Sequence, residues 1–175
     1  GEAKFTEKLD TLFSMSSKME GEVSPDITGL IGQYAHGNEP VHHVPYLYAF
    51  TNKKWQGEAR IKQIRDTMYR AEPNGLAGND DLGQMSAWYV FSALGFYPLN
   101  PVGGDFVLGT PQFSAVTLKL EHGKSLQITA EPSAPGEYVS AVYWNGQPVA
   151  GQVLNYQQLM QGGTLHFEFG PIAAP

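Results

Sequence analysis

Two adjacent carboxylates, Asp80 and Asp81, precede a long apolar run in the segment GNDDLGQMSAWYVFSALGFY, residues 78–97. A carboxylate beside the free N–H groups of a helix start has a lowered pKa and stays ionised, which suits a general base that activates water. Asp81 and Gln84 also match a capping box, in which the Asp81 side chain accepts from the Gln84 N–H and Gln84 reaches back. The cap accounts for Asp81 but not for Asp80 or Asn79, so a helix cap and a reactive site both stay open.

Aromatic residues follow these carboxylates and could form the floor of a sugar site. They are Trp88, Tyr89, Phe91, Phe96 and Tyr97. Aromatic residues at helical spacing more often belong to a hydrophobic core, where their large apolar area is buried. The run is compatible with either role.

A second polar cluster lies in GQYAHGNEPVHHVPY, residues 32–46, which contains Gln33, His36, Asn38, Glu39, His42 and His43. His42 and His43 are adjacent, so on a helix they would point about 100° apart and would not form the i, i+4 pair of a helical zinc motif. The oxygen donors of Gln33, Asn38 and Glu39 suit a hard cation such as calcium. In the alternative interpretation, Asn38 begins a helix with Glu39 and Pro40 in its first turn, and the histidines are polar surface.

Composition limits the function classes. The chain has 175 residues, of which 42% are hydrophobic and 12% aromatic, enough for a packed core. Its formal net charge of -6 and its scattered basic residues argue against a nucleic-acid partner, which would need a basic patch. There is no cysteine, which excludes disulfides and zinc thiolate sites. No apolar run is long enough for a membrane span, and the start of the chain reads as a helix in the middle of something larger.

Helix patterns fill the first hundred residues. Apolar residues at helical spacing predict helices over residues 3–15 and 55–70, and a compact apolar stretch predicts another over Val41–Phe50, irregular at Pro45. The opening segment predicts a fourth helix, Leu82–Leu94, which Gly95 should end.

After Pro98 the pattern alternates with period two. It predicts strands at FVLG, FSAVTLKL, SLQITAE, YVSAVYW and GTLHFEF, with a helical turn at LNYQQLMQGG. Asn145-Gly146 is a two-residue hairpin signal. We therefore predict an α+β fold: a helical segment over residues 1–98, then a small antiparallel β unit over residues 99–175, with the boundary near 98–104.

The two polar segments resemble a known family. GLIGQYAHGNEPVHHVPYLY and RIKQIRDTMYRAEPNGLAGNDDLGQMSAWYVFSALGFYP are similar to the carboxy-terminal catalytic region of the calcium-dependent α-mannosidases of glycoside hydrolase family 92. The similarity covers about residues 1–115 and thins out in the β half. It implies that the helices are part of an (α/α)6 barrel, and that the reaction is hydrolysis of α-linked mannose from glycans with inversion.

The resemblance also implies roles for individual residues. The family's base aspartate lies in a Gly-Asp-Glu-Asp-x-Gly-Gln-Met-Ser-Ala-Trp motif, which places Asp81 as the base, with Asn79 and Asp80 in the same catalytic segment. Asn79 replaces an acid found in many members, which puts any role for a charge there in doubt. The GNEP loop matches the calcium and substrate region, which implies Gln33, Asn38 and Glu39 as metal ligands and His36, Glu39 and Trp88 as substrate contacts. Calcium would bind the mannose 2- and 3-hydroxyls and help to distort the ring.

One element of the family pattern is missing from this sequence. The general acid of the family is a glutamate in a Thr-Glu-Gly-Asn-x-Trp-Gln type segment, which does not occur here. We therefore expect a fragment that supplies the base, docks on the amino-terminal remainder of the enzyme and is inactive without it. We also expect a periplasmic or extracellular location. The alternatives are a non-catalytic carbohydrate-binding module, with Tyr143 and Trp144 as its aromatic platform, and a purely structural domain.

Overall fold

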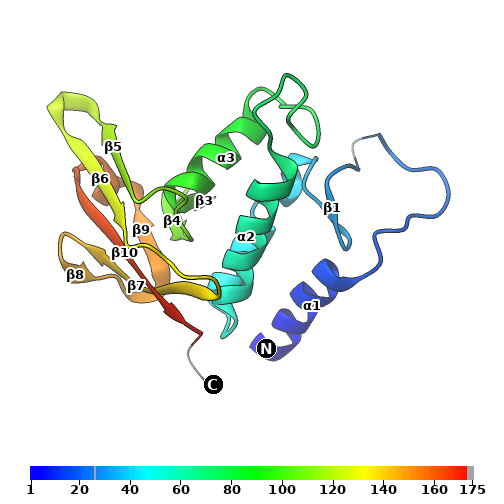
Figure 1. Cartoon of the computed structure of the whole chain (residues 1–175), viewed down its shortest axis with the longest axis horizontal. Helices are drawn as coiled ribbons and strands as arrows, with labels where there is room; N and C mark the ends of the chain where they lie inside the picture. The colour runs from blue at the N-terminus through cyan, green and yellow to red at the C-terminus, as the bar shows by residue number, and fades with distance from the viewer. Residues whose placement is uncertain (26, 173–175) are drawn as a thin grey trace. The chain divides into compact units, whose positions relative to one another are not determined.

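The computed structural model describes residues 1–25 and 27–172. The chain divides into two compact units, one over Gly1–Val90 and one from Phe91 onward. Helices dominate the first unit and strands the second (Figure 1). The predicted succession of helices and then mostly antiparallel strands is confirmed.

The first unit is built from helices and one short hairpin. Its elements are α1 (Glu2–Ser14), β1 (Leu30–Ile31), β2 (Tyr34–Ala35), the 3-10 helices η1 (Glu39–Val41) and η2 (Val44–Phe50), α2 (Lys54–Met68) and the start of α3 (Gln84–Leu94). α1 and α2 match the predicted ranges closely, the predicted helix over Val41–Phe50 forms as 3-10 turns around Pro45, and α3 begins at Gln84, two residues after the predicted start. Among the described residues, no helix combines the length and the apolar content that a bilayer crossing requires.

The apolar stripe of α1 forms part of the core of this unit. Leu9 and Phe13 are buried, and the Phe13 ring lies 4.9 Å from the ring of Tyr34 and 6.1 Å from that of Tyr48. Gly57 of α2 approaches η2 closely, because a Cβ there would lie 2.7 Å from the Pro45 carbonyl oxygen. These contacts hold the segment between α1 and α2 against both helices.

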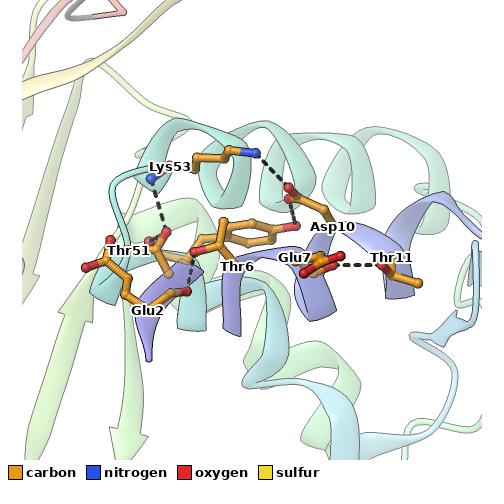
Figure 2. A network of polar contacts seen from close by, with 8 residues as sticks. Glu2, Thr6, Glu7, Asp10, Thr11, Thr51 and Lys53 are labelled. Atoms are coloured by element: carbon orange, nitrogen blue, oxygen red, sulfur yellow. Dashed lines mark hydrogen bonds and ion pairs between the residues drawn. The ribbon is translucent and has the colours of Figure 1, made fainter. Parts of the chain in front are cut away.

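A polar network fixes the outer side of α1 to the turn that precedes α2 (Figure 2). Asp10 accepts from Lys53 Nζ at 2.7 Å and from the Tyr48 hydroxyl at 2.8 Å. Burial alone would raise the pKa of the Asp10 carboxyl, but these two hydrogen bonds, together with the positive charges of Lys53 and Arg60, hold the pKa below its usual range. Glu2 adds a hydrogen bond from the Asn52 backbone N–H at 2.8 Å.

The second unit contains two sheets. A five-stranded sheet has the order β5-β6-β10-β7-β8 and a three-stranded sheet the order β3-β4-β9. The elements are β3 (Phe96–Asn100), β4 (Asp105–Leu108), β5 (Ala115–Lys119), η3 (Glu121–Gly123), β6 (Ser125–Ala130), β7 (Glu137–Trp144), β8 (Gln147–Pro148), η4 (Ala150–Gln152), β9 (Val153–Asn155), α4 (Tyr156–Met160) and β10 (Gly163–Pro171). Their buried faces form one core that includes Leu126, Ile128, Val142, Leu165 and Phe167.

The prediction of an all-antiparallel unit is wrong at one strand pair. β10 pairs in parallel with β6 and antiparallel with β7. After β9 and α4 the chain returns to the five-stranded sheet, where β10 lies between β6 and β7, two strands that precede it in the sequence. Two local predictions are confirmed: Asn145 and Gly146 have φ values of 49° and 78° in the β7–β8 hairpin, and Gly95, with φ of 91°, follows the last residue of α3.

Candidate active site

The two polar segments singled out by sequence meet at a pair of glycines in the first unit. A Cβ added to Gly78 would collide with the Gly37 carbonyl oxygen, and one added to Gly37 would collide with Thr28 Oγ1. Gly37 also donates its N–H to the Thr28 carbonyl oxygen at 3.0 Å. Because only glycine allows this backbone approach, both segments depend on glycine for their juxtaposition.

A cavity of about 280 Å³ lies where these segments meet. Its wall includes Thr28, Gly37, Gly78, Asn79 and Asp81. Two members of the predicted catalytic segment, Asn79 and Asp81, therefore line the same hollow as the glycine that precedes Asn38. This size suits one small polar ligand at the lower end of the usual range for binding pockets.

Asp81 lies on a left-handed turn. Asp81, Leu82 and Gly83 have φ values of 47°, 57° and 94°, and α3 begins at the next residue. Each non-glycine residue in this region costs about 1–2 kcal/mol, less for an aspartate, which tolerates the region better than most residues. Backbone strain of this kind persists only where surrounding contacts enforce it, and it concentrates at functional sites. The turn leaves the Asp81 side chain at the surface and the Leu82 side chain fully exposed.

The carboxylate that caps α3 is Asp80. Asp80 Oδ1 accepts from the Ser86 backbone N–H at 2.9 Å, and the Asp80 carbonyl oxygen accepts from the Met85 N–H at 3.1 Å. The capping-box prediction gave this role to the Asp81 side chain; the Gln84 N–H is instead bound by the Asp81 backbone carbonyl at 3.2 Å. The left-handed turn moves the helix start to Gln84, so the cap shifts to Asp80.

A buried hydrogen-bond network connects the two segments beneath the cavity. The His42 and His36 rings stack with their centroids 4.6 Å apart, and both side chains are buried. His42 Nε2 lies 3.0 Å from the His36 carbonyl oxygen and His42 Nδ1 lies 3.1 Å from Gln84 Nε2. Trp88 Nε1 donates to the His42 carbonyl oxygen at 2.9 Å. Both histidines were expected to be polar surface in the alternative interpretation, which is therefore wrong for them.

The partners of each ring fix its tautomer. A carbonyl oxygen can only accept, so His42 carries its proton on Nε2 and accepts from Gln84 at Nδ1. The Tyr69 hydroxyl donates to the Met85 carbonyl oxygen at 3.1 Å, so its oxygen accepts from His36 Nε2 at 2.6 Å. His36 Nδ1 then accepts from the Tyr34 hydroxyl at 2.8 Å. Every ring nitrogen of both histidines has a matched partner in the neutral form.

Burial keeps both histidines neutral. Desolvation, assisted by the neighbouring His42, lowers the pKa of His36 to about 3. Desolvation also lowers the pKa of His42, against the opposing effects of its bond to the His36 carbonyl and of the charges of Glu39 and Asp81. The network therefore has a fixed arrangement of donors and acceptors near neutral pH.

The predicted metal ligands lie at or near the surface. Gln33 is exposed and donates its side-chain amide to the Ser16 carbonyl oxygen, Asn38 is half-buried before η1, and Glu39 is exposed. Asn38 does start a short helix with Glu39 and Pro40 in its first turn, as the alternative interpretation expected. Within residues 1–25 and 27–172, no group of three histidines or carboxylates is placed to hold a metal. Asn38 and Glu39 supply the oxygen donors that calcium prefers, but only part of the six to eight that it takes.

The predicted substrate contacts divide by exposure. His36 and Trp88 have no accessible surface, and their rings pack edge to face with centroids 4.4 Å apart. Glu39 is exposed and lies two residues after the cavity-lining Gly37 in the sequence. Of the three predicted substrate contacts, it is the one that a substrate can reach in this conformation. His36 and Trp88 instead support the segments from below.

Comparison with known proteins identifies the fold and the family of this chain. Over 97% of its length the chain is similar to a family 92 α-mannosidase from Bacteroides thetaiotaomicron solved in complex with mannoimidazole, with 38% identity and a TM-score of 0.89. A family 92 inverting mannosidase from the same organism matches over 97% of the chain with 32% identity and a TM-score of 0.78. The chain thus has the fold of part of a family 92 glycoside hydrolase. The glycosyl hydrolase family 92 catalytic domain matches residues 1–171, and the chain belongs to that family.

The chain corresponds to a limited part of these relatives. It covers 22% and 24% of the two bacterial mannosidases. It is also 25% identical over 138 residues to an uncharacterized secreted glycosidase from Arthroderma benhamiae, which is 77% of this chain and 18% of that protein. The family resemblance seen in the two polar segments is confirmed, and the family match extends to residue 171, through the β half in which the sequence resemblance thins out.

Proposed function

We propose that this chain forms part of the active site of an exo-acting α-mannosidase that removes α-linked mannose from glycans with inversion. The observation that carries the proposal is the position of Asp81. It occupies the base position of the family motif, lines the 280 Å³ cavity and lies on a left-handed turn that holds its carboxylate at the surface. Membership of family 92 and the mannosidases among its structural relatives support the substrate class.

In the proposed reaction Asp81 acts as the general base. Its carboxylate takes a proton from a water molecule, the water oxygen attacks the anomeric carbon, and the bond from that carbon to the glycosidic oxygen breaks. The leaving oxygen takes a proton from a second carboxyl group, which in an inverting enzyme lies about 6.5–9.5 Å from the first. We place this acid outside the chain, because the sequence contains no segment of the family's acid type. Asn79, on the same cavity wall, would orient the water or a sugar hydroxyl.

Calcium is part of the proposal. Asn38 and Glu39, with Gln33, would supply oxygen ligands, and further ligands would come from the rest of the enzyme or from the substrate. Bound calcium would supply Lewis-acid polarisation of the sugar hydroxyls. The partners that we propose are a mannose-containing glycan and the amino-terminal remainder of an (α/α)6 barrel. A periplasmic or extracellular location is supported by the description of the fungal relative as secreted.

Replacing Asp81 tests the assignment. Asp81→Asn keeps the size of the side chain and tolerates positive φ as well as aspartate does, so it should abolish turnover of an α-mannoside by the full-length protein while the thermal unfolding midpoint changes little. A matched control is Asp66→Asn, which removes an exposed carboxylate from α2. Near-normal turnover of the Asp81 variant would end the assignment.

The carbohydrate-binding alternative loses its predicted platform. Tyr143 and Trp144 are successive residues of β7 and point to opposite faces of the sheet. Tyr143 donates its hydroxyl to Glu168 at 3.3 Å, whereas Trp144 packs against the hydrophobic core. They cannot present two rings to one sugar.

A further inference from the structure

His42 connects the polar segment of residues 32–46 to the first turn of α3 through hydrogen bonds. Its ring donates to the His36 carbonyl oxygen within its own segment and accepts from Gln84 Nε2 in the other segment. Its backbone carbonyl accepts from Trp88 Nε1, one turn further along α3. With an exposed fraction of 1%, the side chain is shielded from bulk solvent and lies in a closely packed environment.

The bond to Gln84 reaches the strained turn directly. Gln84 is the first residue of α3, and its backbone N–H donates to the carbonyl oxygen of Asp81 at 3.2 Å. The His42 ring is therefore two hydrogen bonds away from the Asp81 backbone. The hydrogen bond from Gln84 to Asp81 closes the turn that contains the left-handed residues Asp81 and Leu82. Their backbone conformation costs free energy and would relax if Gln84 were free to move.

We propose that His42 is a positioning residue: through its Nδ1 acceptor it fixes the Gln84 amide, and Gln84 in turn holds the left-handed Asp81–Leu82 turn that aims the Asp81 carboxylate. This inference rests on the proposed role of Asp81 as base. It assigns to His42 no contact with substrate, metal or the reacting atoms. Displacement of a reacting group by about 1 Å can cost on the order of 100-fold in rate, so a small relaxation of the turn should be visible in kcat.

Two substitutions of His42 separate positioning from packing. His42→Asn keeps an acceptor near the position of Nδ1, facing Gln84, and loses the donor to His36. His42→Gln keeps a donor near the position of Nε2 and loses the acceptor. Both remove one hydrogen bond, but His42→Asn removes the larger volume from this buried place, so a purely structural role predicts at least as large a loss of activity in His42→Asn as in His42→Gln. The positioning role predicts that kcat falls about tenfold or more in His42→Gln but no more than about threefold in His42→Asn, with KM little changed in both.

Gln84→Met provides an independent measurement at a half-buried position, with a side chain of similar length. It removes the amide that His42 binds and should lower kcat as much as His42→Gln does. The double variant His42→Gln/Gln84→Met should lose about tenfold, rather than the roughly 100-fold expected for independent sites, because the bond is already absent in either single variant. All variants are made in the full-length protein and assayed by release of mannose from an α-linked mannobiose.

Asp81→Asn, assayed in parallel, distinguishes the two levels of the argument. If Asp81→Asn retains turnover, the proposed function is wrong and the positioning role falls with it. If Asp81→Asn is inactive while the kcat of His42→Asn is equal to or below that of His42→Gln, or while Gln84→Met is as active as the native protein, only the positioning role is overturned. Should His42→Gln fail to fold, Gln84→Met alone decides the question.

Discussion

At the scale of single residues, the two adjacent carboxylates have separate tasks. Asp80 binds a backbone N–H of the first turn of α3 through its side chain, and Asp81 faces the cavity from a left-handed turn. One carboxylate thus fixes the helix start while its neighbour stays at the surface beside the cavity. Because Asp80 caps the helix, the backbone at Asp81 can be strained without loss of that cap.

The cap should be measurable in the stability of α3. Asp80→Ala removes the acceptor of the Ser86 N–H and should lower the free energy of local opening by about 1 kcal/mol. Hydrogen exchange of the amides in residues 84–94 measures this opening. Asp80→Asn, which can still accept, should lose less than half as much. Equal protection in the Ala variant and the native protein would show that the cap contributes nothing.

Sequence reasoning found these residues but exchanged their local roles. The pattern Asp81-x-x-Gln84 matches a capping box only if the intervening residues are helical. Leu82 has positive φ, which is rare for a bulky residue and leaves no signature in composition or periodicity. The position of Asp81 in the family motif was therefore predictable, whereas its backbone conformation and the cap at Asp80 needed coordinates.

At the scale of elements, the buried histidines join the GNEP loop to α3. Their partners Tyr69, Gln84 and Trp88 lie 33 to 46 residues away along the chain. A local pattern cannot indicate such long-range partners, so the histidines read as surface polar residues. The helices and most strands were predictable because periodicity is local. The strands β3 and β9 were not, since each is defined by its pairing with β4, and the parallel pairing of β10 with β6 was not, since it depends on the return of the chain after β9 and α4.

The histidine network should make the first unit sensitive to acid. The folded state holds the pKa of His36 at about 3, below the ordinary histidine value of 6.5, so the unfolded state binds the proton more readily between these values. The stabilising contribution is complete above pH 6.5 and is lost as pH falls toward 3, with a slope of at most about 1.4 kcal/mol per pH unit for this group. The measurement is the protection of amide hydrogens in residues 34–48 against exchange, which should be lower at pH 5 than at pH 7 when both are measured in the presence of a chelator.

The matching control removes the titratable ring. His36→Gln cannot gain a proton, so its protection should be lower at pH 7 but should depend less on pH than that of the native protein. His122, exposed in η3, offers a second control, because His122→Gln should leave the pH dependence of residues 34–48 unchanged. A native protein whose protection is flat from pH 7 to pH 5 would contradict the expected burial of a neutral His36.

Gly95 should be required where α3 ends. Its φ of 91° is unfavourable for other residues, and a Cβ would lie 3.0 Å from Pro111 Cβ and 3.1 Å from Phe167 Cζ. Gly95→Ala should therefore lower the free energy of unfolding of the second unit by more than the roughly 1–2 kcal/mol that the backbone strain alone would cost. Gly123→Ala is the matched control, since Gly123 has φ of 73° and a Cβ there meets nothing within 4 Å. Equal losses in the two variants would show that the contacts with Pro111 and Phe167 add nothing.

At the scale of the whole molecule, the family 92 domain matches nearly the full length of the chain. The chain itself corresponds to only about a fifth of the length of its relatives. The cavity at Gly37 and Gly78 is lined by the proposed base Asp81, and two proposed calcium ligands, Asn38 and Glu39, follow Gly37 in the sequence. Both are incomplete in chemical terms: an inverting hydrolysis needs a second carboxyl group, and calcium needs further oxygen ligands. The proposal that the remainder of the enzyme completes both sites follows from these two requirements together.

Calcium removal tests this view of the complete protein. If Asn38 and Glu39 help to bind calcium, chelation should abolish turnover and lower the unfolding midpoint, because a ligand at 100 times its Kd stabilises the folded state by about 2.7 kcal/mol. Added calcium should restore both, and magnesium should not, since its octahedral demand and tightly held waters fit an irregular loop poorly. Glu39→Gln should raise the calcium concentration needed for half-restoration, whereas Glu121→Gln, an exposed carboxylate of η3, should not. Turnover that survives exhaustive chelation would remove calcium from the mechanism while leaving the role of Asp81 to its own test.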